Sequence, residues 1–597
     1  MWMKRTATCG ELRADRVGEE VILNGWVNRR RDHGGLIFID LRDRYGITQV
    51  VFSPKRSPEA HAAGQELRAE YVIAVKGAVA ERPPGTQNSE LATGAVEVQA
   101  ARLELLAKSE TPPFYINEEV DVDETLRLKY RYLDLRRARQ RENIILRHDL
   151  VTLIRDYMNE RDFLEIETPI LVKSTPEGSR DFIVPSRVHK GSFYALPQSP
   201  QQMKQILMIA GFDRYYQIAR CFRDEDPRAD RSLEHTQLDV EMAFVEESDV
   251  MQTIEGLQYR IVEELSGKRI KEKPFPKITL RDALAYYGKD NPDLRFDMKL
   301  KDLSDAVRGG GFRVFDRVLD QGGVVKALPL PGCAHYSRGQ VDDLAETLKR
   351  FGAKGQISVS RVGTEHRSPV KSALGDRLFG AVISELELGD GDLALIVADK
   401  AEVANASLGI LREIMGDRLG LRDKSEMAFA WVVGFPVLEP VEGEDKFTFS
   451  HNPFCGVVDG DESLLDTSPL SAGSKQYDLV CNGLELGGGS VRIHDAQLQR
   501  KIFRLLGYTD GQIEDQFGGM LRAFDFGAPP HGGIAMGIDR VAMLLRDTDN
   551  LREIVAFPKT QEGVDLAQRA PSAVTAEQLD ELGLILDEEP EPISYAD

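Results

Sequence analysis

The segment RCFRDEDPRADR, residues 220–231, is saturated with charges of both signs. Four arginines alternate in it with four acids: Arg220, Arg223, Arg228 and Arg231 with Asp224, Glu225, Asp226 and Asp230. A solvated surface loop is the usual interpretation of such a mixture, because exposed ion pairs add little stability. The segments on either side favour a different interpretation.

Two strand-like segments flank this charged loop. YYQIARCFRDE (215–225) and HTQLDVEMAF (235–244) are predicted to form a long antiparallel hairpin. With the two-residue period of a strand, Arg223 and Glu225 share one face of the first strand. Three polar residues share a face of the second strand: Gln237, Asp239 and Glu241. Because a buried sheet face is normally apolar, this polar row predicts the floor of a ligand site.

Two later segments have related features. YDLVCNGLELGGGSVRIHD (477–495) places Glu485 before three glycines and Arg492 after them. Since Glu485 and Arg492 differ in strand parity, a bulge or a strand end is predicted at the glycines. GAPPHGGIAMGIDRVAMLL (527–545) is predicted to be a glycine-rich strand that enters a helix, with Arg540 in the first turn. A helix N-terminus with an arginine suits a terminal phosphate.

The length and composition are typical of a multidomain globular protein. The chain has 597 residues, of which 42% are hydrophobic and 29% charged, and such a length predicts roughly three to five domains. No run approaches the ~18 consecutive apolar residues of a membrane span. The first five residues are followed by polar ones, so no signal peptide is predicted. We therefore expect a cytoplasmic protein with no membrane partner.

Charge and cysteine content limit the possible partners. The net charge of −21 disfavours non-specific nucleic-acid binding, because phosphate affinity depends on lysine and arginine. A nucleic-acid partner would need local basic patches, and Arg29–Arg31 and the stretch Arg127–Arg141 are candidates. A solvated charged face explains each patch equally well. The five cysteines are scattered without a Cys-x-x-Cys pair, so neither a disulfide framework nor a structural zinc site is predicted.

The rhythm of apolar residues and turns predicts six parts. They are a barrel (1–107), a hinge (108–136), two pieces of one domain that carries the site-like motifs (137–290 and 427–560), an insertion between them (291–426), and a C-terminal extension (561–597). Five short strands between residues 20 and 107 favour the OB-fold, a small barrel that commonly binds oligonucleotides. A helix is expected from Glu142, followed by a strand over FLEIE (163–167). The insertion lacks site-like motifs, and its role stays open.

Three segments, in order, resemble the motifs of class II aminoacyl-tRNA synthetases. FLEIETP is similar to motif 1, RCFRDED with HTQLDVE to motif 2, and GIDR to motif 3. The chain is most similar to the bacterial-type aspartyl-tRNA synthetases, through GWVNRRRD, KYRYLDLRR, STPEGSRDF, ALPQSPQ, GGGSVRIH and APPHGGIA. This resemblance spans essentially the whole chain. It implies an α+β fold: a five-stranded OB-fold barrel, an antiparallel catalytic sheet with helices, and an inserted α/β domain.

The resemblance also implies a reaction and its participants. Members attach L-aspartate to tRNA(Asp) at the expense of ATP, through an aspartyl-adenylate, and work with Mg²⁺ as homodimers. The expected catalytic residues are Arg223, Glu485 and Arg540, with Arg223 on the α-phosphate and Arg540 on the γ-phosphate. The expected ATP site also includes Asp224, Glu225, His235, Gly537, Ile538 and Asp539. Asp478 and Glu485 are expected to hold Mg²⁺, which prefers carboxylate and phosphate oxygens.

An aspartate substrate offers one ammonium and two carboxylates, so its pocket needs both signs of charge. The resemblance assigns Lys204 and Arg492 to the side-chain carboxylate, and a guanidinium suits such bidentate capture. It assigns Glu177, Gln201 and Asp239 to the ammonium end, and Arg223 and His451 complete the pocket. Three positions depart from the family pattern, the first two near the nucleotide and the third beside His451: Ser232, His235 and Asn452.

The barrel is expected to bind the tRNA anticodon. By resemblance, Phe38 stacks on a base, Gln49 bonds to a base edge, and Arg31 anchors the same loop. His33 and Gly85 resemble the relaxed members that also load tRNA(Asn), since strict members often have Leu at the first position and a larger residue at the second. The alternative is a strictly tRNA(Asp)-specific enzyme in which both residues are neutral loop variation.

Three other functions are disfavoured by particular residues. A synthetase for asparagine or lysine would meet the wrong charge at Lys204 and Arg492. An amide ligase built on a similar core would lack the N-terminal barrel. A non-catalytic RNA-binding descendant would have lost Arg223, Glu485 or Arg540, all of which are present.

Overall fold

The computed structural model describes residues 3–118, 120–175, 178–441, 443–587, 593 and 595. The chain divides into two compact units. One contains the residues up to Ile145 together with Arg552–Ala573, and the other contains Leu146–Leu551 and the segment that begins at Val574. None of the helices that the structure describes is long and apolar enough to cross a bilayer.

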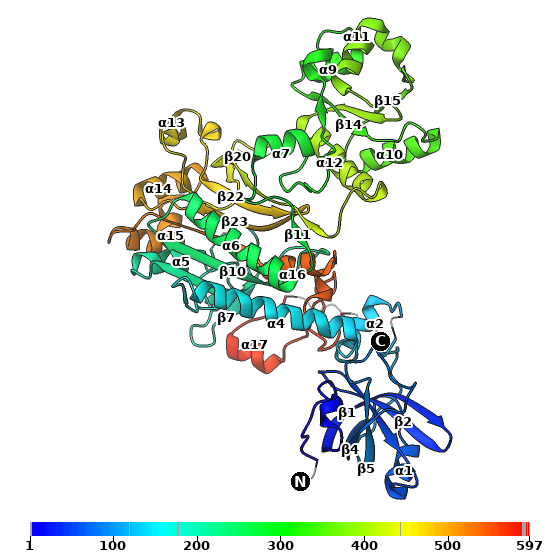
Figure 1. Cartoon of the computed structure of the whole chain (residues 1–597). Helices are drawn as coiled ribbons and strands as arrows, with labels where there is room; N and C mark the ends of the chain where they lie inside the picture. Colours follow the sequence, from blue (N-terminus) through cyan, green and yellow to red (C-terminus); the bar gives the residue numbers. More distant parts are fainter. Residues whose placement is uncertain are drawn as a thin grey trace. The chain divides into compact units, whose positions relative to one another are not determined.

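A closed five-stranded barrel forms the N-terminal part of the first unit (Figure 1). Its strands are β1 (Glu20–His33), β2 (Leu36–Arg42), β3 (Ile47–Phe52), β4 (Val72–Glu81) and β5 (Val96–Ala107), in the order β1-β2-β3-β5-β4. Helix α1 (Pro58–Gln65) follows β3 and is capped by Ser57. Only β3 and β5 pair in parallel. The predicted OB-fold barrel is confirmed.

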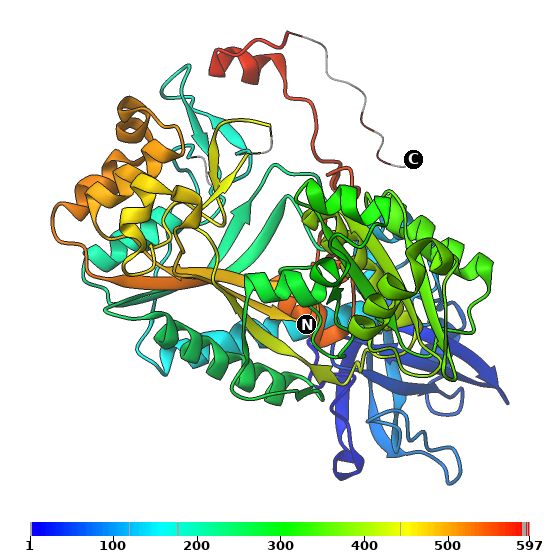
Figure 2. The same cartoon turned by 90° about the horizontal axis from the view of Figure 1, so that it is seen from above.

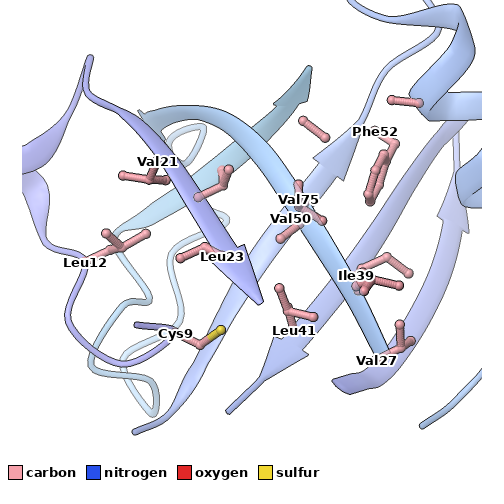
Figure 3. Packing of buried hydrophobic residues seen from close by; sticks show 14 of the residues in the cluster. Cys9, Leu12, Val21, Leu23, Val27, Ile39, Leu41, Val50, Phe52 and Val75 are labelled. Atoms are coloured by element: carbon pink, nitrogen blue, oxygen red, sulfur yellow. The ribbon is translucent and has the colours of Figure 1, made fainter. Parts of the chain in front are cut away.

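Alternation along the strands produces the barrel core. In β1 every second residue from Val21 to Val27 is buried, which is the period of a strand with one face inward. Figure 3 shows these side chains converging with Ile39, Leu41 and Phe52 inside the barrel. The residues between them, Ile22, Asn24 and Trp26, are only partly buried and face outward.

The predicted hinge contains two short helices, α2 (Glu124–Lys129) and α3 (Arg131–Asp134). Arg131 is almost fully buried and donates to the carbonyl oxygens of Arg552, Val555 and Ala556 at 2.8, 2.8 and 2.9 Å. Arg127 pairs with Glu553 at 2.8 Å. These arginines hold the chain together, so the stretch Arg127–Arg141 is not a uniformly available basic patch.

The second unit is built on an eight-stranded sheet with the order β12-β19-β22-β23-β24-β10-β9-β6. The strands are β12 (Lys277–Thr279), β19 (Phe429–Val433), β22 (Gln476–Cys481), β23 (Leu484–Val491), β24 (His531–Gly537), β10 (Glu234–Ala243), β9 (Arg214–Phe222) and β6 (Leu164–Glu165). All pairs from β19 to β9 are antiparallel, and only the two outer pairs are parallel. The predicted antiparallel catalytic sheet is confirmed.

Helices cover this sheet. Helices α4 (Ala138–Asn159) and α6 (Glu247–Leu265) lie side by side on one face (Figures 1 and 2), where the hydroxyl of Tyr157 donates to the carbonyl of Thr253 at 2.9 Å. Helix α16 (Ile538–Arg546) contacts α4 through Asp539 and Arg147, and its Leu544 carbonyl accepts from Lys268, just after α6, at 2.7 Å. Three other helices of this unit are α5 (Gln201–Ile209), α14 (Ala496–Leu505) and α15 (Asp510–Phe524). Near them are β7 (Ile183–Pro185), β8 (Phe193–Ala195), β20 (Leu438–Pro440), β21 (Phe447–Phe449), α13 (Leu464–Thr467) and α17 (Ala576–Leu582).

Several sequence-based boundaries differ from the structure. Strand β9 ends at Phe222, so Arg223 and Glu225 follow the strand and do not share one of its faces. The helix expected from Glu142 begins at Ala138. The strand expected over FLEIE is only β6, because it pairs with the outermost part of β9 and then leaves the sheet.

The bulge predicted at the glycines is present. The β22–β23 register jumps between Leu479 and Val480, whose partners are Gly487 and Glu485, so Leu486 is the extra residue. Arg492 lies one residue beyond the end of β23. The bulge reverses the alternation of the strand, which explains how Glu485 and Arg492 can lie on the same face of the sheet.

The insertion folds around a five-stranded sheet of its own. Its strands, β13 (Lys301–Asp302), β14 (Val324–Leu330), β17 (Leu393–Asp399), β15 (Ile357–Val362) and β16 (Glu365–Arg367), pair antiparallel. Five helices accompany them: α8 (Ser304–Val307), α9 (Arg313–Asp320), α10 (Arg338–Arg350), α11 (Lys371–Leu386) and α12 (Ala401–Arg418). Leu395 and Ile396, neighbours on β17, enter two different apolar clusters. Both faces of this sheet are therefore covered.

Candidate active site

A cleft of about 530 Å³ opens on the face of the eight-stranded sheet opposite α4 and α6. The predicted residues that line it are Gln201, Arg223, Glu225, His235, His451, Glu485, Gly537, Asp539 and Arg540. They come from α5, the loop after β9, β10, the 448–454 loop, β23 and the start of α16. The sheet therefore brings together segments that are more than three hundred residues apart.

A row of residues across four strands runs beneath the cleft, and its two middle members, Ala535 and Gly488, line the cleft itself. Asp239 on β10 lies opposite Ala535 on β24, which lies opposite Gly488 on β23, and Gly488 lies opposite Asp478 on β22. The two middle residues are small, so the row is open between two carboxylates. A Cβ atom on Gly488 would lie 2.6 Å from Cε1 of His451 and 2.8 Å from Oδ1 of Asp478. Glycine is therefore needed there to leave space for both groups.

A buried lattice of charges lies at one end of this row. Nζ of Lys204 is 3.1 Å from Asp239 and 3.5 Å from Glu241. Arg492 contacts both carboxylate oxygens of Glu241 at 3.0 and 3.2 Å and donates to the hydroxyl of Ser490 at 2.9 Å. All four charged side chains are at most 2% exposed. They form the wall under the cleft and do not lie on its surface.

The two acids of the lattice differ in their environment. Burial raises the pKa of Asp239 above its usual range, despite the nearby Lys204. The pKa of Glu241 is lowered: burial acts to raise it, but Arg492 and Lys204 together outweigh burial. Oδ2 of Asp239 has no hydrogen-bond partner among the described residues. Buried polar atoms are nearly always paired, so this oxygen is a candidate acceptor for a ligand.

Cationic groups line the other end of the cleft. Nη1 of Arg540 donates to the carbonyl oxygen of Glu485 at 2.6 Å, and Nη2 lies 3.3 Å from Asp230. Nε of Arg223 is buried without a hydrogen-bond partner among the described residues. One arginine is held in place, and the other keeps a donor for a ligand.

Two histidines in the cleft are held neutral. Burial, together with Arg223, lowers the pKa of His235 to about 4. Burial, together with Arg492 and Arg223, lowers the pKa of His451 to about 3. Neither imidazole adds positive charge near neutral pH, so the cations that line the cleft are its arginines.

Asp478 and Glu485 form a carboxylate pair beside the floor. Burial and the neighbouring Glu485 raise the pKa of Asp478 well above its usual range. Within the described residues, no group of three or more His, Cys, Asp or Glu side chains could hold a metal ion. Such a pair fits Mg²⁺, which takes one or two protein carboxylates and fills its remaining positions with phosphate oxygens and water.

Some predicted residues are placed elsewhere. Asp224 turns away from the cleft toward Arg180, at 3.5 Å. Ile538 is buried in α16 and does not line the cleft. Glu177 lies outside the described residues, so the structure does not place it. Asn452 lines the cleft, and its Oδ1 accepts the backbone N–H of Phe454 at 3.0 Å.

The sequence placed Glu241 in the polar row with Asp239 but did not identify it as the partner of Arg492. Two further residues of the site were missed. Gln205 and His531 are buried and hydrogen-bonded to each other at 3.0 Å behind the cleft. Nothing in their local sequence indicates this pair, because α5 and β24 are far apart in the chain.

The predicted anticodon residues lie on the outer face of the barrel. Nη2 of Arg31 lies 2.7 Å from Asp40 and 3.3 Å from Oε1 of Gln49, whose Nε2 donates to Glu97 at 2.9 Å. Phe38 is directly opposite Arg31 in the β1–β2 pair. These four residues and Phe38 make a polar surface around one aromatic ring.

His33 and Gly85 lie apart from that polar group. His33 is the last residue of β1, at the tip of the hairpin, and Gly85 has a φ of +84° in an exposed turn. The structure joins Arg31 to Gln49 and places Phe38 opposite Arg31, while His33 ends β1 and Gly85 lies in a turn.

Comparison with known proteins agrees with this geometry. The model for class II tRNA synthetases (D, K and N) matches residues 123–561. The chain belongs to this family. A second model, the OB-fold nucleic acid binding domain, matches residues 21–106.

Curated relatives of this class II chain are similar over their full length. The Aspartate–tRNA(Asp/Asn) ligase of Desulfatibacillum aliphaticivorans is 49% identical over 590 residues, which cover 98% of each chain. That of Rubrobacter xylanophilus is 51% identical over 582 residues, 98% of this chain and 97% of the relative. Both comparisons extend through the barrel, the insertion and the catalytic sheet.

Solved structures share the fold of this class II synthetase. An asparaginyl-tRNA synthetase from Pyrococcus horikoshii complexed with asparaginyl-adenylate superposes with a TM-score of 0.58 and 18% identity, covering 93% of this chain and 98% of that one. An aspartyl tRNA synthetase from Entamoeba histolytica superposes with a TM-score of 0.56 and 18% identity, covering 93% of this chain and 92% of that one. At this identity the likeness concerns the fold alone.

The neutral His235 should make the stability of this synthetase depend on pH. The unfolded chain takes up a proton as the pH falls below 6.5, whereas folded His235 stays neutral to about pH 4. The free energy of unfolding should therefore fall over that window. In His235→Phe the fall should be smaller, as measured by urea unfolding at about pH 7 and about pH 5.

The control for this comparison is His189→Phe, which changes an exposed histidine of the same unit. Its pH dependence should match that of the wild-type chain. If the free energy of unfolding fell equally with pH in His235→Phe and in the wild-type chain, the fold would not hold His235 neutral.

Proposed function

We propose that this chain attaches L-aspartate to tRNA(Asp) at the expense of ATP, and also charges tRNA(Asn). The observation that carries the amino acid assignment is the buried pair Lys204 and Arg492 below the cleft. Two fixed cations match a substrate with an extra carboxylate, and they would leave an asparagine amide or a lysine ammonium poorly matched. The names of the curated relatives support the same substrate.

The first step needs no nucleophilic side chain. The α-carboxylate of aspartate attacks the α-phosphorus of ATP, an acyl–phosphate bond forms, and the bond to pyrophosphate breaks. A terminal ribose hydroxyl of the tRNA then attacks the acyl carbon, and AMP leaves. The protein contributes orientation and electrostatic stabilisation of the charge that develops at phosphorus.

The arginines of the cleft suit this chemistry. Arg223 has a buried Nε donor without a protein partner and is assigned to the α-phosphate. Arg540, held by Glu485 and Asp230, is assigned to the γ-phosphate end. Glu225 is assigned to the adenine, beside the neutral ring of His235, which has less area for stacking than a phenylalanine.

Asp478 and Glu485 would hold Mg²⁺ together with the phosphates. The ion would offset phosphate charge and orient the pyrophosphate leaving group. Asp478, whose pKa is raised by Glu485 and burial, would become an anion when a divalent cation is next to it.

The ammonium of aspartate is assigned to the partner-free Oδ2 of Asp239 and to Gln201, with Glu177 as a further candidate. Lys204 and Arg492 are assigned to its side-chain carboxylate. His451, whose burial lowers its pKa to about 3, lies with Asp478 over Gly488 and is assigned to the same pocket.

Removing the Arg223 guanidinium tests the proposed reaction. Aspartate-dependent exchange of pyrophosphate into ATP should fall in Arg223→Ala by two orders of magnitude, about 2.7 kcal/mol, the usual loss when one preorganised donor is removed. Arg228→Ala, an exposed arginine of the same loop, is the matched control and should retain activity. Exchange at the wild-type rate in Arg223→Ala would remove this residue from the mechanism.

Charging of tRNA(Asn) is proposed from the barrel. Asp and Asn anticodons differ only at their third base, so the enzyme discriminates by rejecting one base. His33 at the hairpin tip and Gly85 in its exposed turn offer little bulk for rejection. The alternative is strict specificity for tRNA(Asp), with both residues neutral.

Aminoacylation of tRNA(Asp) and tRNA(Asn) transcripts separates the two possibilities. We expect comparable kcat/KM values for the two, and preference for tRNA(Asp) in His33→Leu. Exchange without tRNA should be unaffected in that variant, which serves as its internal control. A wild-type preference above roughly 10³, about 4 kcal/mol, would establish strict specificity instead.

A second copy of the chain is proposed as a partner. Four large apolar side chains are exposed around the edge of the sheet at β6 and β9: Leu164 (51%), Leu171 (51%), Phe212 (42%) and Phe244 (72%). Clustered apolar surface of this kind usually marks an interface. Because β6 is an edge strand, a twofold contact would cover both the strand and these side chains.

Light scattering at micromolar concentration should give twice the chain mass of 66.7 kDa. Phe244→Asp should shift the mass toward that of one chain, because it introduces a charge into the proposed contact. Phe526→Asp is the matched control, since Phe526 is equally exposed at 74% and lies elsewhere. A fully active wild-type monomer would contradict the homodimer.

A further inference from the structure

A chain of three buried polar side chains connects the cleft to the start of β24. Gln201, the first residue of α5, lines the cleft and is 6% exposed. Gln205, one helical turn later, and His531 are fully buried. The atoms are close enough for direct hydrogen bonds: Gln201 to Gln205 at 3.0 Å, Gln205 to His531 at 3.0 Å, and His531 to the carbonyl of Pro529 at 2.8 Å.

The hydrogen bond between His531 and Pro529, at the end away from the cleft, sets the direction of the other hydrogen bonds among these three side chains. The carbonyl oxygen of Pro529 can only accept, so Nδ1 of His531 must carry a proton and donate. A neutral imidazole has one N–H, and Nε2 is then an acceptor. Only the NH₂ group of Gln205 can pair with that acceptor, so its carbonyl oxygen faces Gln201.

The same logic fixes Gln201. The carbonyl oxygen of Gln205 requires the NH₂ group of Gln201. Oε1 of Gln201 is then the atom left for the cleft, and it accepts no hydrogen bond from any residue that the structure describes. A side-chain amide that could otherwise turn either end to a ligand is held with its acceptor forward.

The state of His531 agrees with this direction. Burial lowers the pKa of its imidazole; Glu241 and the Pro529 carbonyl act to raise it, and Arg492 and His494 act to lower it. The net effect is a pKa below the ordinary value, which keeps the ring neutral near neutral pH. A doubly protonated ring would demand the carbonyl of Gln205 and reverse both amides.

We propose that His531 and Gln205 are positioning residues that orient the Gln201 amide as an acceptor for the ammonium group of the amino acid substrate. This deepens the proposed function and rests on it. With the amide reversed, an NH₂ group would face the ammonium and repel it. Gln201 Oε1 would then act with the partner-free Oδ2 of Asp239, so that both ammonium contacts are acceptors.

Gln205→Met removes the hydrogen bonds of Gln205 to Gln201 and His531 with little change of side-chain volume. The KM for aspartate in pyrophosphate exchange should rise by roughly tenfold or more, the scale of one hydrogen bond to a charged group. The KM for ATP should stay within about twofold, since the amide does not face the nucleotide. Gln258→Met is the matched control: Gln258 is a fully buried glutamine on α6 that donates to Met536 and does not line the cleft.

Gln205→Glu should restore the aspartate KM that Gln205→Met impairs, whereas no such recovery is expected if Gln205 serves only for packing. A carboxylate can only accept from Gln201, and it would draw a proton onto Nε2 of His531, so the Gln201 amide keeps its direction. The aspartate KM should lie within about threefold of wild type, although a buried acid is the harsher change for packing. A packing role predicts the reverse order, with Met better tolerated than Glu.

The outcomes separate cleanly. An unchanged aspartate KM in Gln205→Met, or a folded Gln205→Glu that is as impaired as Gln205→Met, would overturn the proposal. If Gln205→Glu does not fold, the decision rests on Gln205→Met against Gln258→Met, and equal aspartate KM values would overturn it. If the wild-type chain shows no aspartate-dependent exchange, the proposed function has failed, and not merely the amide orientation.

Discussion

The four buried charges of Lys204, Asp239, Glu241 and Arg492 are the constraint on which the rest of the site depends. Each would be costly to bury alone, and together they compensate one another at distances of 3.0 to 3.5 Å. The sheet supplies the rigidity, because β10 positions both acids and the end of β23 positions Arg492. In the proposed function, substrate selectivity follows from these charges, which are fixed before any ligand arrives and so reduce the reorganisation that binding requires.

Small residues are the second requirement of this arrangement. Gly488 leaves room for His451 and Asp478, and a Cβ atom on Gly533 would lie 2.2 Å from Oε2 of Glu241. The strand that carries the glycines must also bulge at Leu486 to present Glu485 and Arg492 to the same site. The glycine-rich character of β23 and β24 is therefore a consequence of building a charged floor inside a sheet.

Much of this could be predicted from sequence, for reasons that differ between elements. Period-two alternation identified β10 and the barrel strands, and parity alone placed Asp239 and Glu241 together. Parity failed for Arg223 and Glu225, because β9 ends at Phe222 and the chain turns into a loop whose course depends on tertiary contacts. Pairings such as Lys204 with Asp239 and Gln205 with His531 join segments with no local pattern in common. They required the fold, or a family resemblance that supplies it indirectly.

The account makes the buried charge lattice the source of amino acid selectivity, and exchange of pyrophosphate into ATP measures that directly. The wild-type chain would be assayed with each of the twenty amino acids in turn, under one set of conditions. The account predicts that aspartate alone drives exchange, because only its side chain presents a carboxylate of the right length to Lys204 and Arg492. Exchange driven equally well by asparagine or lysine would contradict it.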